Sequence, residues 1–316
     1  MRLRSIGLVM VIALAGSVAL GSSQATAIST IPGQFYGLAD VSGTNGDLFR
    51  STTSSSWRRL TSGLRSPESV SASPNGRFAV ICATRGSGGT YRIYRVSAGG
   101  GVIRNLIGNR QGCGQTVSPD NRKVAYITDT GSGTSRLNVV STRGGKVRNL
   151  YRFSSFGMYE PVWAGGRIFF ERRVTRNPSS PLEIYSIRAR DGKKLRRHTN
   201  HGTAPIGYGL RDVSPDGKRL LVAVDRPEAS LEELSTLSLR NRTWSTLISV
   251  STALGRFIGD AAFSPSGESL AYLTGEATPL PFQLWVGPSR PGSWYSAVAG
   301  PASSTSGLFS IDWVRR

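Results

Sequence analysis

Three carboxylates recur at comparable places in this chain and could together support metal chemistry. Glu68, Glu160 and Asp260 each lie near the start of a short strand that the sequence repeats. A hard cation such as Ca²⁺ takes several oxygen ligands, so three converging acids would suit a calcium-dependent hydrolase or small-ligand binder. Alternatively, each acid belongs to the repeated pattern and accepts hydrogen bonds from nearby backbone amides. We favour this structural interpretation and expect no cofactor, with calcium as the alternative.

Sequence motifs for other kinds of catalysis are absent. The chain has no Gly-x-Ser-x-Gly, His-Glu-x-x-His or Cys-x-x-Cys motif. Its two histidines, His198 and His201, lie three residues apart at the end of one predicted outer strand. That spacing brings two metal ligands together on a helix, whereas on a strand and its exit loop we expect solvated side chains. We therefore expect a protein that is not an enzyme.

Cys82 and Cys113 are the only cysteines of the chain. In the alignment of repeats, Cys82 lies in the second strand of one unit and Cys113 at the start of the next unit's first strand. Neighbouring units would therefore bring the two sulfurs together, and an oxidising compartment would favour a disulfide. Two buried free thiols are the alternative.

A repeated turn defines the elements that must position these side chains. Ser-Pro-x-x turns occupy residues 73–76, 118–121, 214–217 and 264–267, and residues 164–166 form a shortened copy. They recur at multiples of about 45 to 50 residues with four short strands per unit, which indicates a β-propeller. Serine, proline, Asx and glycine in this order fit type I turns between antiparallel strands.

The two ends of the chain predict how the ring closes. Residues 36–41, 47–50 and 57–61 match the second, third and fourth strands of a unit, but the first strand is missing. Residues 309–313 match a first strand. One C-terminal strand and three N-terminal strands therefore complete a sixth blade, which removes two unpaired sheet edges. We predict an all-β, six-bladed propeller of four-stranded antiparallel blades.

Several segments resemble the repeats of TolB-type propellers. The matching segments are Glu-Pro-Val-Trp at 160–163, Ser-Pro-Asp-Gly-Lys at 214–218, Ile-Tyr at 184–185, Arg-Asp-Gly-Lys-Lys-Leu at 190–195, Asp-Leu-Phe at 47–49 and Leu-Thr at 60–61. The resemblance covers nearly the whole chain after the leader and implies a six-bladed ring closed by strands from both termini. It also implies a periplasmic protein that binds partner proteins. TolB proper carries an additional N-terminal α/β domain, which this sequence lacks.

The connections between one predicted blade and the next are rich in aromatic and arginine residues. Such residues are enriched among the anchors of protein interfaces, and loops on rigid scaffolds often carry function. The alternative is that these rings only wedge between blades. The partner-binding candidates are Arg110, Phe156, Tyr159, Tyr208, Arg211, Arg256 and Phe257.

The N-terminus has the pattern of an export signal. Arg2 and Arg4 precede an apolar run over residues 6–20, and Ala25-Thr26-Ala27 fits a cleavage site. We predict a cleaved signal peptide over residues 1–27 and one propeller domain over residues 28–316, with no transmembrane segment after cleavage. A retained membrane anchor is the alternative. The predicted location is the periplasm, the cell envelope or the outside of the cell.

The formal net charge of +20 suggests acidic partners. Lys and Arg are scattered over strands and turns, and no helix or arm is available to enter a nucleic-acid groove, so we expect no specific nucleic-acid binding. We predict a monomer that binds a protein or an anionic envelope polymer through the loops at its channel mouth. A calcium-dependent hydrolase and an adhesive wall component are the alternatives.

Overall fold

The alternation of side chains between the two faces of each strand explains how the core is built. In this computed structural model, strand β5 (Phe78–Thr84) is buried at every position. Successive side chains point to opposite faces of a strand. Ala79 and Ile81 therefore pack against the preceding blade, and Val80 and Cys82 pack against the following one. The hydrophobic core consists of such layers between neighbouring blades.

The structure describes most of the chain from residue 33 onward, as one compact unit. The predicted signal peptide lies outside the described residues. The described ranges are 33–40, 46–51, 56–85, 89–101, 103–130, 133–154, 157–177, 179–202, 206–276, 282–292, 296–301 and 308–314.

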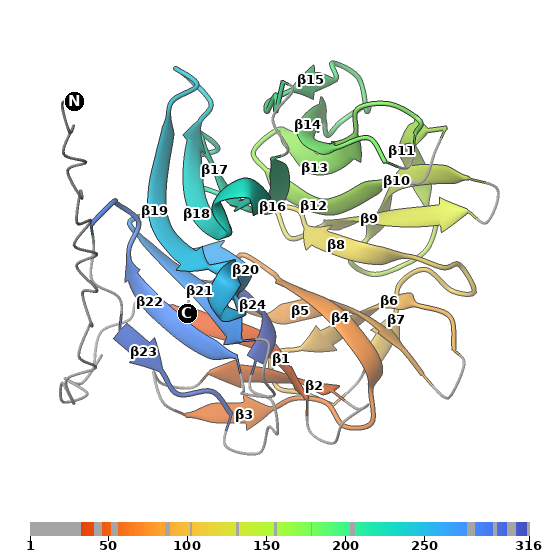
Figure 1. Cartoon of the computed structure of the whole chain (residues 1–316). Coiled ribbons are helices and arrows are strands. Elements are labelled where there is room, and N and C mark those ends of the chain that lie inside the picture. Colours follow the sequence, from red (N-terminus) through yellow and green to blue (C-terminus); the bar gives the residue numbers. More distant parts are fainter. Residues whose placement is uncertain are drawn as a thin grey trace, which may run out of the picture. The chain divides into compact units, whose positions relative to one another are not determined.

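Six four-stranded antiparallel sheets surround a common centre (Figure 1). We number the blades from the one that contains both ends of the chain. Blade 1 comprises β24 (Leu308–Val314), β1 (Gln34–Asp40), β2 (Gly46–Ser51) and β3 (Trp57–Arg59); blade 2, β4 (Arg65–Ala72), β5, β6 (Arg92–Ser97) and β7 (Ile103–Asn105); and blade 3, β8 (Cys113–Val117), β9 (Lys123–Thr130), β10 (Thr134–Ser141) and β11 (Arg148–Phe153).

The second half of the ring has the same organisation. Blade 4 comprises β12 (Met158–Ala164), β13 (Arg167–Arg173), β14 (Leu182–Arg188) and β15 (Arg196–Arg197); blade 5, β16 (Gly207–Val213), β17 (Arg219–Arg226), β18 (Leu231–Ser238) and β19 (Trp244–Ser251); and blade 6, β20 (Arg256–Phe263), β21 (Ser269–Glu276), β22 (Gln283–Pro288) and β23 (Ser296–Val298). The predicted fold class is confirmed.

Ring closure also follows the prediction. Strand β24 pairs antiparallel with β1, with Gln34 opposite Val314 and Tyr36 opposite Asp312. The Tyr36 hydroxyl then donates a buried 2.7 Å hydrogen bond to the carbonyl of Gly76 in blade 2. Blade 1 therefore joins both ends of the chain to the rest of the ring.

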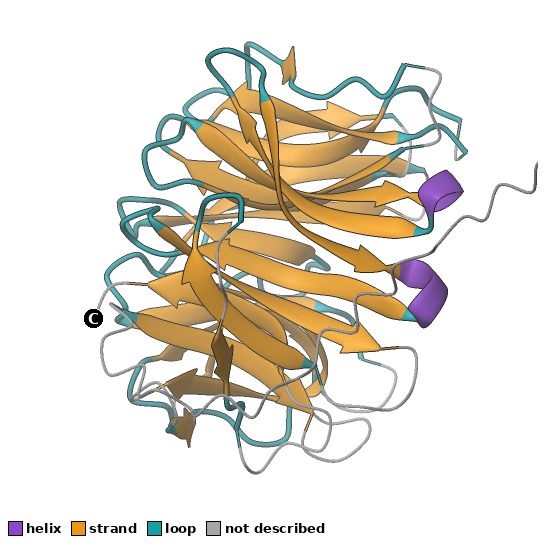
Figure 2. Cartoon of the chain, turned by 60° about the vertical axis from the view of Figure 1, so that its left-hand side comes forward, coloured by secondary structure: helices purple, strands orange, loops and turns teal. Residues whose placement is uncertain are grey.

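The antiparallel order gives the propeller two different faces. The Ser-Pro turns and the connections between third and fourth strands lie on one face, which we call the turn face. The connections between blades and between second and third strands lie on the other, the linker face. Two short 3₁₀ helices, η1 (Pro227–Ala229) and η2 (Thr252–Leu254), lie together on the linker face (Figure 2). Among the described residues, no helix is long and apolar enough to cross a membrane.

Hydrogen bonds from side chains join the inner strands near the turn face. One residue near the turn-face end of each inner strand donates its backbone N–H to a carboxylate or hydroxyl oxygen, because an inner strand is an edge of its sheet and the N–H groups on its free side have no ladder partner. Ser71, Thr116, Asp212 and Asp312 each accept from the following blade, and the two aspartates also accept from their own strands. The six donors are Ala72, Val117, Trp163, Val213, Phe263 and Trp313.

Candidate binding site at the linker face

A pocket of ≈ 560 Å³ opens between blades 4 and 5 on the linker face. The first residues of β12 and β16 supply its inner wall, since both strands start on this face. The pocket contains three of the predicted partner-binding residues and one of the predicted metal ligands. Its polar and aromatic lining includes Tyr159, Glu160, Glu171, Arg173, Tyr208, Arg211, Asp225 and Glu232.

The backbone of Glu160 takes a left-handed conformation that is unfavourable for residues other than glycine. It lies in the bulge of β12 between Tyr159 and Val162 and has a φ of 42°. The following proline disfavours helical backbone angles at the same position. Gly114 occupies the corresponding bulge in blade 3 with a φ of 50°. Non-glycine residues held in such regions cost about 1–3 kcal/mol and cluster at functional sites.

The Glu160 carboxylate is exposed to the pocket and has no partner. Among the described residues, no hydrogen bond or ion pair reaches its oxygens, although protein surrounds it. Burial raises its pKa, the negative charges of Asp260 and Glu68 raise it further, and the positive charge of Arg211 opposes them. A carboxylate in this setting gains from a ligand that brings positive charge.

Arg211 is the complementary group of the pocket. Its Nε atom is buried and has no hydrogen-bond partner among the described residues. Its charge lowers the pKa values of Glu160, Glu171 and Glu232, yet none of these acids forms a salt bridge with it. A carboxylate without a protein partner and an arginine with an unused Nε donor therefore line the same pocket, where both are available to a ligand.

Three further carboxylates of the pocket, Glu171, Asp225 and Glu232, were not predicted from the sequence. Glu171 is buried at the end of β13, and its Oε1 accepts a 2.6 Å hydrogen bond from the backbone of Leu210. Burial and the charge of Glu160 raise the pKa of Glu171 to about 8. Glu232 accepts from the backbone of Ile258 at 2.8 Å. The one available signal for Glu171 was an acid that directly follows an apolar strand, Ile-Phe-Phe.

Tyrosine rings form the apolar part of the pocket. Tyr159 is 38% exposed. Tyr208 stacks on Trp244 with ring centroids 5.5 Å apart, and burial raises the pKa of its hydroxyl. Tyrosine presents a large apolar surface with a polar tip, and its ring face attracts cations.

The other predicted partner-binding residues lie outside this pocket. Arg110 is exposed in the connection between blades 2 and 3. Arg256 pairs with Glu276 at 3.3 Å, and Phe257 contacts Phe282 edge to face at a centroid distance of 5.4 Å. Phe156 lies outside the described residues. The pocket thus gathers Tyr159, Tyr208 and Arg211, whereas Arg110, Arg256 and Phe257 lie elsewhere on the linker face.

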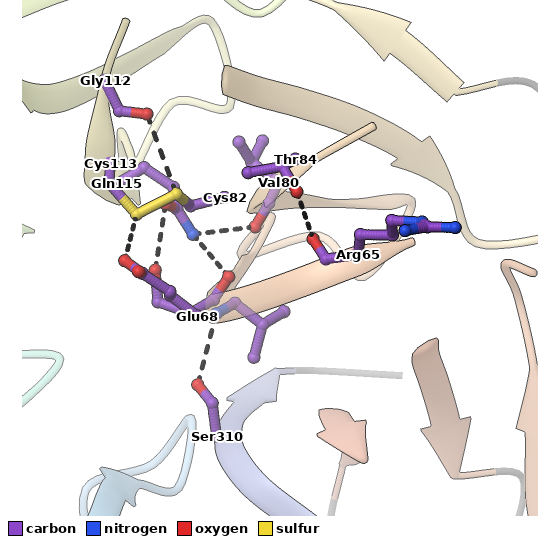
Figure 3. Close-up of a disulfide and its surroundings, with 11 residues drawn as sticks. Arg65, Glu68, Val80, Cys82, Thr84, Gly112, Cys113, Gln115 and Ser310 are labelled. Carbon is purple, nitrogen blue, oxygen red and sulfur yellow. Dashed lines mark hydrogen bonds between the residues drawn. A yellow bond between two sulfur atoms is a disulfide. The ribbon is translucent and has the colours of Figure 1, made fainter. Parts of the chain in front are cut away.

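The predicted disulfide is present (Figure 3). Cys82 of β5 and Cys113 of β8 are bonded with a Cα–Cα distance of 5.3 Å, which covalently links blades 2 and 3. The Glu68 carboxylate lies 2.9 Å from the Cys113 sulfur. Gln115 next to the disulfide donates to the carbonyl of Ser69 at 2.9 Å, so hydrogen bonds reinforce the same junction.

The three carboxylates considered as calcium ligands do not come together. Among the described residues, the one group of three potential ligand atoms within 4.8 Å of one another is Glu68, Cys82 and Cys113, and its two sulfurs form the disulfide. Both oxygens of Asp260 accept hydrogen bonds, from Ala261, Ser310 and Ile311. Calcium binding would require these side chains to rearrange, and it stays a prediction.

The expectation of solvated histidines was wrong. His198 is buried, its Nε2 lies 2.6 Å from the hydroxyl oxygen of Ser186, and its ring contacts Phe169. Burial, together with the positive charges of nearby arginines, lowers its pKa to about 4. His201 contacts the buried carboxylate of Glu183, which also binds Arg197 and Thr199. Polar residues at the end of a short outer strand gave no sign of this packing.

The geometry defines a TolB-like six-bladed β-propeller with a carboxylate-rich pocket on one face. A TolB structure from Acinetobacter baumannii has the same fold, with a TM-score of 0.70 over 90% of this chain and 67% of that chain, at 16% identity. A chain of the nidogen/laminin complex matches with a TM-score of 0.62 over 89% of this chain and 98% of its own, at 12% identity. No protein-family profile matches the sequence.

One curated protein is similar in sequence, and it corrects the expectation that this chain is not an enzyme. The uncharacterized peptidase YuxL of Bacillus subtilis is 27% identical over 169 residues, which is 43% of this chain and 25% of that protein. The missing motifs were therefore an insufficient ground for excluding enzymes, because a protein named as a peptidase contains a segment of similar sequence. Their absence excludes only the classes of enzyme that depend on those motifs.

Proposed function

We propose that the linker-face pocket binds a peptide segment of another protein. Glu160 would accept the ammonium or guanidinium group of a basic residue, and Arg211 would donate to a carbonyl or carboxylate oxygen of the same segment. Tyr159 and Tyr208 would pack against its aliphatic part. The observation that carries the proposal is the unpaired Glu160 carboxylate, held at positive φ beside the under-satisfied Arg211.

Several observations support a protein as the partner. Standard interfaces combine an aromatic and arginine core with polar groups, as this pocket does. A propeller of the same fold forms part of the nidogen/laminin complex. An export-type N-terminus and the Cys82–Cys113 disulfide support a location outside the cytoplasm. The pocket's excess of acids over arginines makes it a poor place for an anionic polymer.

A selection of random heptapeptides displayed on phage, captured by the immobilised protein, tests the proposal. We expect the captured peptides to be enriched in Lys or Arg and to bind Glu160→Gln and Arg211→Gln at least tenfold more weakly. Glu228→Gln is the matched control, because it removes an exposed acid of η1 on the same face. Captured peptides without basic residues, or equal binding to wild type and Glu160→Gln, would overturn the proposal.

A second candidate function is peptide processing, and the similarity to YuxL favours it. Glu171 would act as a general acid, because its pKa of about 8 leaves it protonated at neutral pH. Mass spectrometry of captured peptides after incubation is the test. Cleavage by the wild type that disappears in Glu171→Gln would support processing, and intact peptides in both would reject it.

A further inference from the structure

The turn face carries most of the net positive charge of the molecule. Its described turns and connections, together with the strand residues that directly flank them, contain seventeen basic residues and only four acids, Asp120, Asp191, Asp216 and Glu268. The basic residues are Arg77, Arg122, Lys123, Arg143, Lys146, Arg148, Arg167, Arg188, Arg190, Lys193, Lys194, Arg196, Lys218, Arg219, Arg240, Arg242 and Arg290. A formal charge excess of thirteen on one face compares with +20 for the whole chain.

These charges are concentrated on three consecutive blades. Fifteen of the seventeen belong to blades 3, 4 and 5, and we call these fifteen, from Arg122 to Arg242, the basic arc. The arc is continuous across the blade boundaries. Arg148 of blade 3 donates a 2.9 Å hydrogen bond to the carbonyl of Arg190 in blade 4. Arg196 of blade 4 and Arg242 of blade 5 both lie close enough to His198 to lower its pKa.

The acids within the arc do not cancel its charge. Asp120 and Asp216 accept hydrogen bonds from the serine hydroxyls of their own turns, each at 2.6 Å, and Asp191 pairs with Arg188. These three carboxylates therefore shape their turns and leave most of the surrounding cations unpaired. Twelve formal positive charges of the arc are left over to attract an anion.

The arc also contains cations that are already held in place. Arg167 donates to the Ser186 hydroxyl at 2.8 Å and to the carbonyls of Ser186 and Lys194. Burial lowers its pKa, and the nearby charges of Arg196 and Arg188 lower it further. A bound anion would relieve this repulsion, and prearranged cations lose little conformational entropy on binding.

A hollow of ≈ 420 Å³ lies in the arc at the boundary of blades 3 and 4. Lys123, Arg188 and Arg190 line it, with Trp163 at the side of the channel mouth. The arc extends over three blades, so it suits an extended chain that carries several anionic groups better than a single small anion. Arginine, which supplies most of these cations, matches phosphate oxygens with two parallel hydrogen bonds.

We infer that the basic arc binds a linear polymer that carries phosphate groups. The polymer would lie along blades 3 to 5 and place one phosphate in the hollow at Lys123 and Arg190. Recognition would depend on the charge of the polymer and on the spacing of its phosphate groups. This site is separate from the linker-face pocket, so the two ligands would bind at the same time.

The test measures binding of a linear polyphosphate of defined length at several salt concentrations. Binding should weaken steeply with salt, because contacted phosphates release their counterions. The variant with Lys123→Gln, Lys146→Gln and Lys193→Gln should lower the slope of log affinity against log salt by about 2 to 3. All three lysines are exposed, so circular dichroism should show an unchanged fold.

The matched control removes three exposed arginines near the linker face, in the variant with Arg65→Gln, Arg110→Gln and Arg152→Gln. It should retain the wild-type slope. Equal losses in the two triple variants would overturn the inference, because net charge alone would then explain binding. Binding to vesicles of anionic phospholipid in the absence of polyphosphate binding would also overturn it in favour of a membrane surface.

Discussion

Glu160 combines backbone strain with an unpaired charge, and both have a common origin. The bulge of β12 turns the residue out of the regular ladder, so its side chain faces the pocket while its backbone takes a φ of 42°. The equivalent glycine in blade 3 shows that the bulge itself needs no carboxylate. The side chain therefore adds nothing to the local structure that glycine would not supply.

Replacing Glu160 with glycine should separate stability from binding. Glu160→Gly should raise the free energy of unfolding by about 1 kcal/mol, because it relieves the backbone strain at this position. It should also abolish binding of the selected peptides. Urea unfolding measures the first effect, with Glu160→Gln as the control that keeps the strain. A loss of stability in Glu160→Gly would show that the carboxylate has a structural role.

The carboxyl of Glu171 should make stability depend on pH. Its pKa is about 8 in the folded protein against an ordinary value of 4.5, so the folded state holds a proton that the unfolded state has lost between these values. Stability therefore falls as the pH rises from 4.5 to 8, by at most about 1.4 kcal/mol per pH unit for this group.

Glu171→Gln imitates the protonated carboxyl and should flatten that slope. The amide oxygen can still accept the hydrogen bond from Leu210. Asp212, whose pKa is raised to about 8 by burial and by Asp312, and Asp312 itself, raised to about 6, should contribute to the slope that is left. Unfolding experiments at a series of pH values provide the measurement, and an unchanged slope in Glu171→Gln would contradict the assignment.

At the scale of strands and blades, side-chain acceptors hold the ring together near the turn face. Thr116 accepts a 3.0 Å hydrogen bond from Trp163 of the following blade. Thr116→Val keeps the shape but leaves this N–H without an acceptor, which should cost about 1–3 kcal/mol. Chemical unfolding measures the loss.

The equivalent position in blade 4 supplies the control. The Val162 side chain has no acceptor atom. The corresponding backbone N–H of the following blade, that of Val213, donates instead to Asp212 of its own strand. Val162→Thr should therefore change stability by less than about 0.5 kcal/mol, as surface-like substitutions do. If both variants were equally stable, the cross-blade hydrogen bonds would not contribute as proposed.

The Cys82–Cys113 disulfide should stabilise the junction of blades 2 and 3. It closes a loop with a sequence separation of 31, for which chain entropy predicts a contribution of about 3–4 kcal/mol. Reductant should lower the melting temperature of the wild type. The variant with both cysteines replaced by alanine should melt at the reduced value and show no response to reductant. A response in that variant would point to another cause.

At the scale of the whole molecule, charge is divided between the two faces. Four carboxylates, Glu160, Glu171, Asp225 and Glu232, line the linker-face pocket, whereas the basic arc lies on three of the six blades at the turn face. Net charge alone suggested an anionic partner at the channel mouth. The structure separates these features, so the pocket suits cationic groups and the opposite face suits anions.

The sequence predicted the features that repeat, because each copy confirms the others. The six blades, the ring closure and the Cys82–Cys113 contact all followed from the alignment of units. The features that differ from one blade to the next were harder to predict. The bulge that exposes Glu160 depends on strand register, and the burial of His198 depends on Phe169 of another strand; neither leaves a pattern in the local sequence.

The most direct test of the peptide-binding site is a double-mutant cycle across it. A selected peptide and its version with the key lysine replaced by norleucine are titrated against wild type and Glu160→Gln. Direct pairing of the lysine with Glu160 predicts a coupling free energy of about 1 kcal/mol or more. If the effects of the two changes simply add, Glu160 does not contact the basic group. That result would contradict the proposed site.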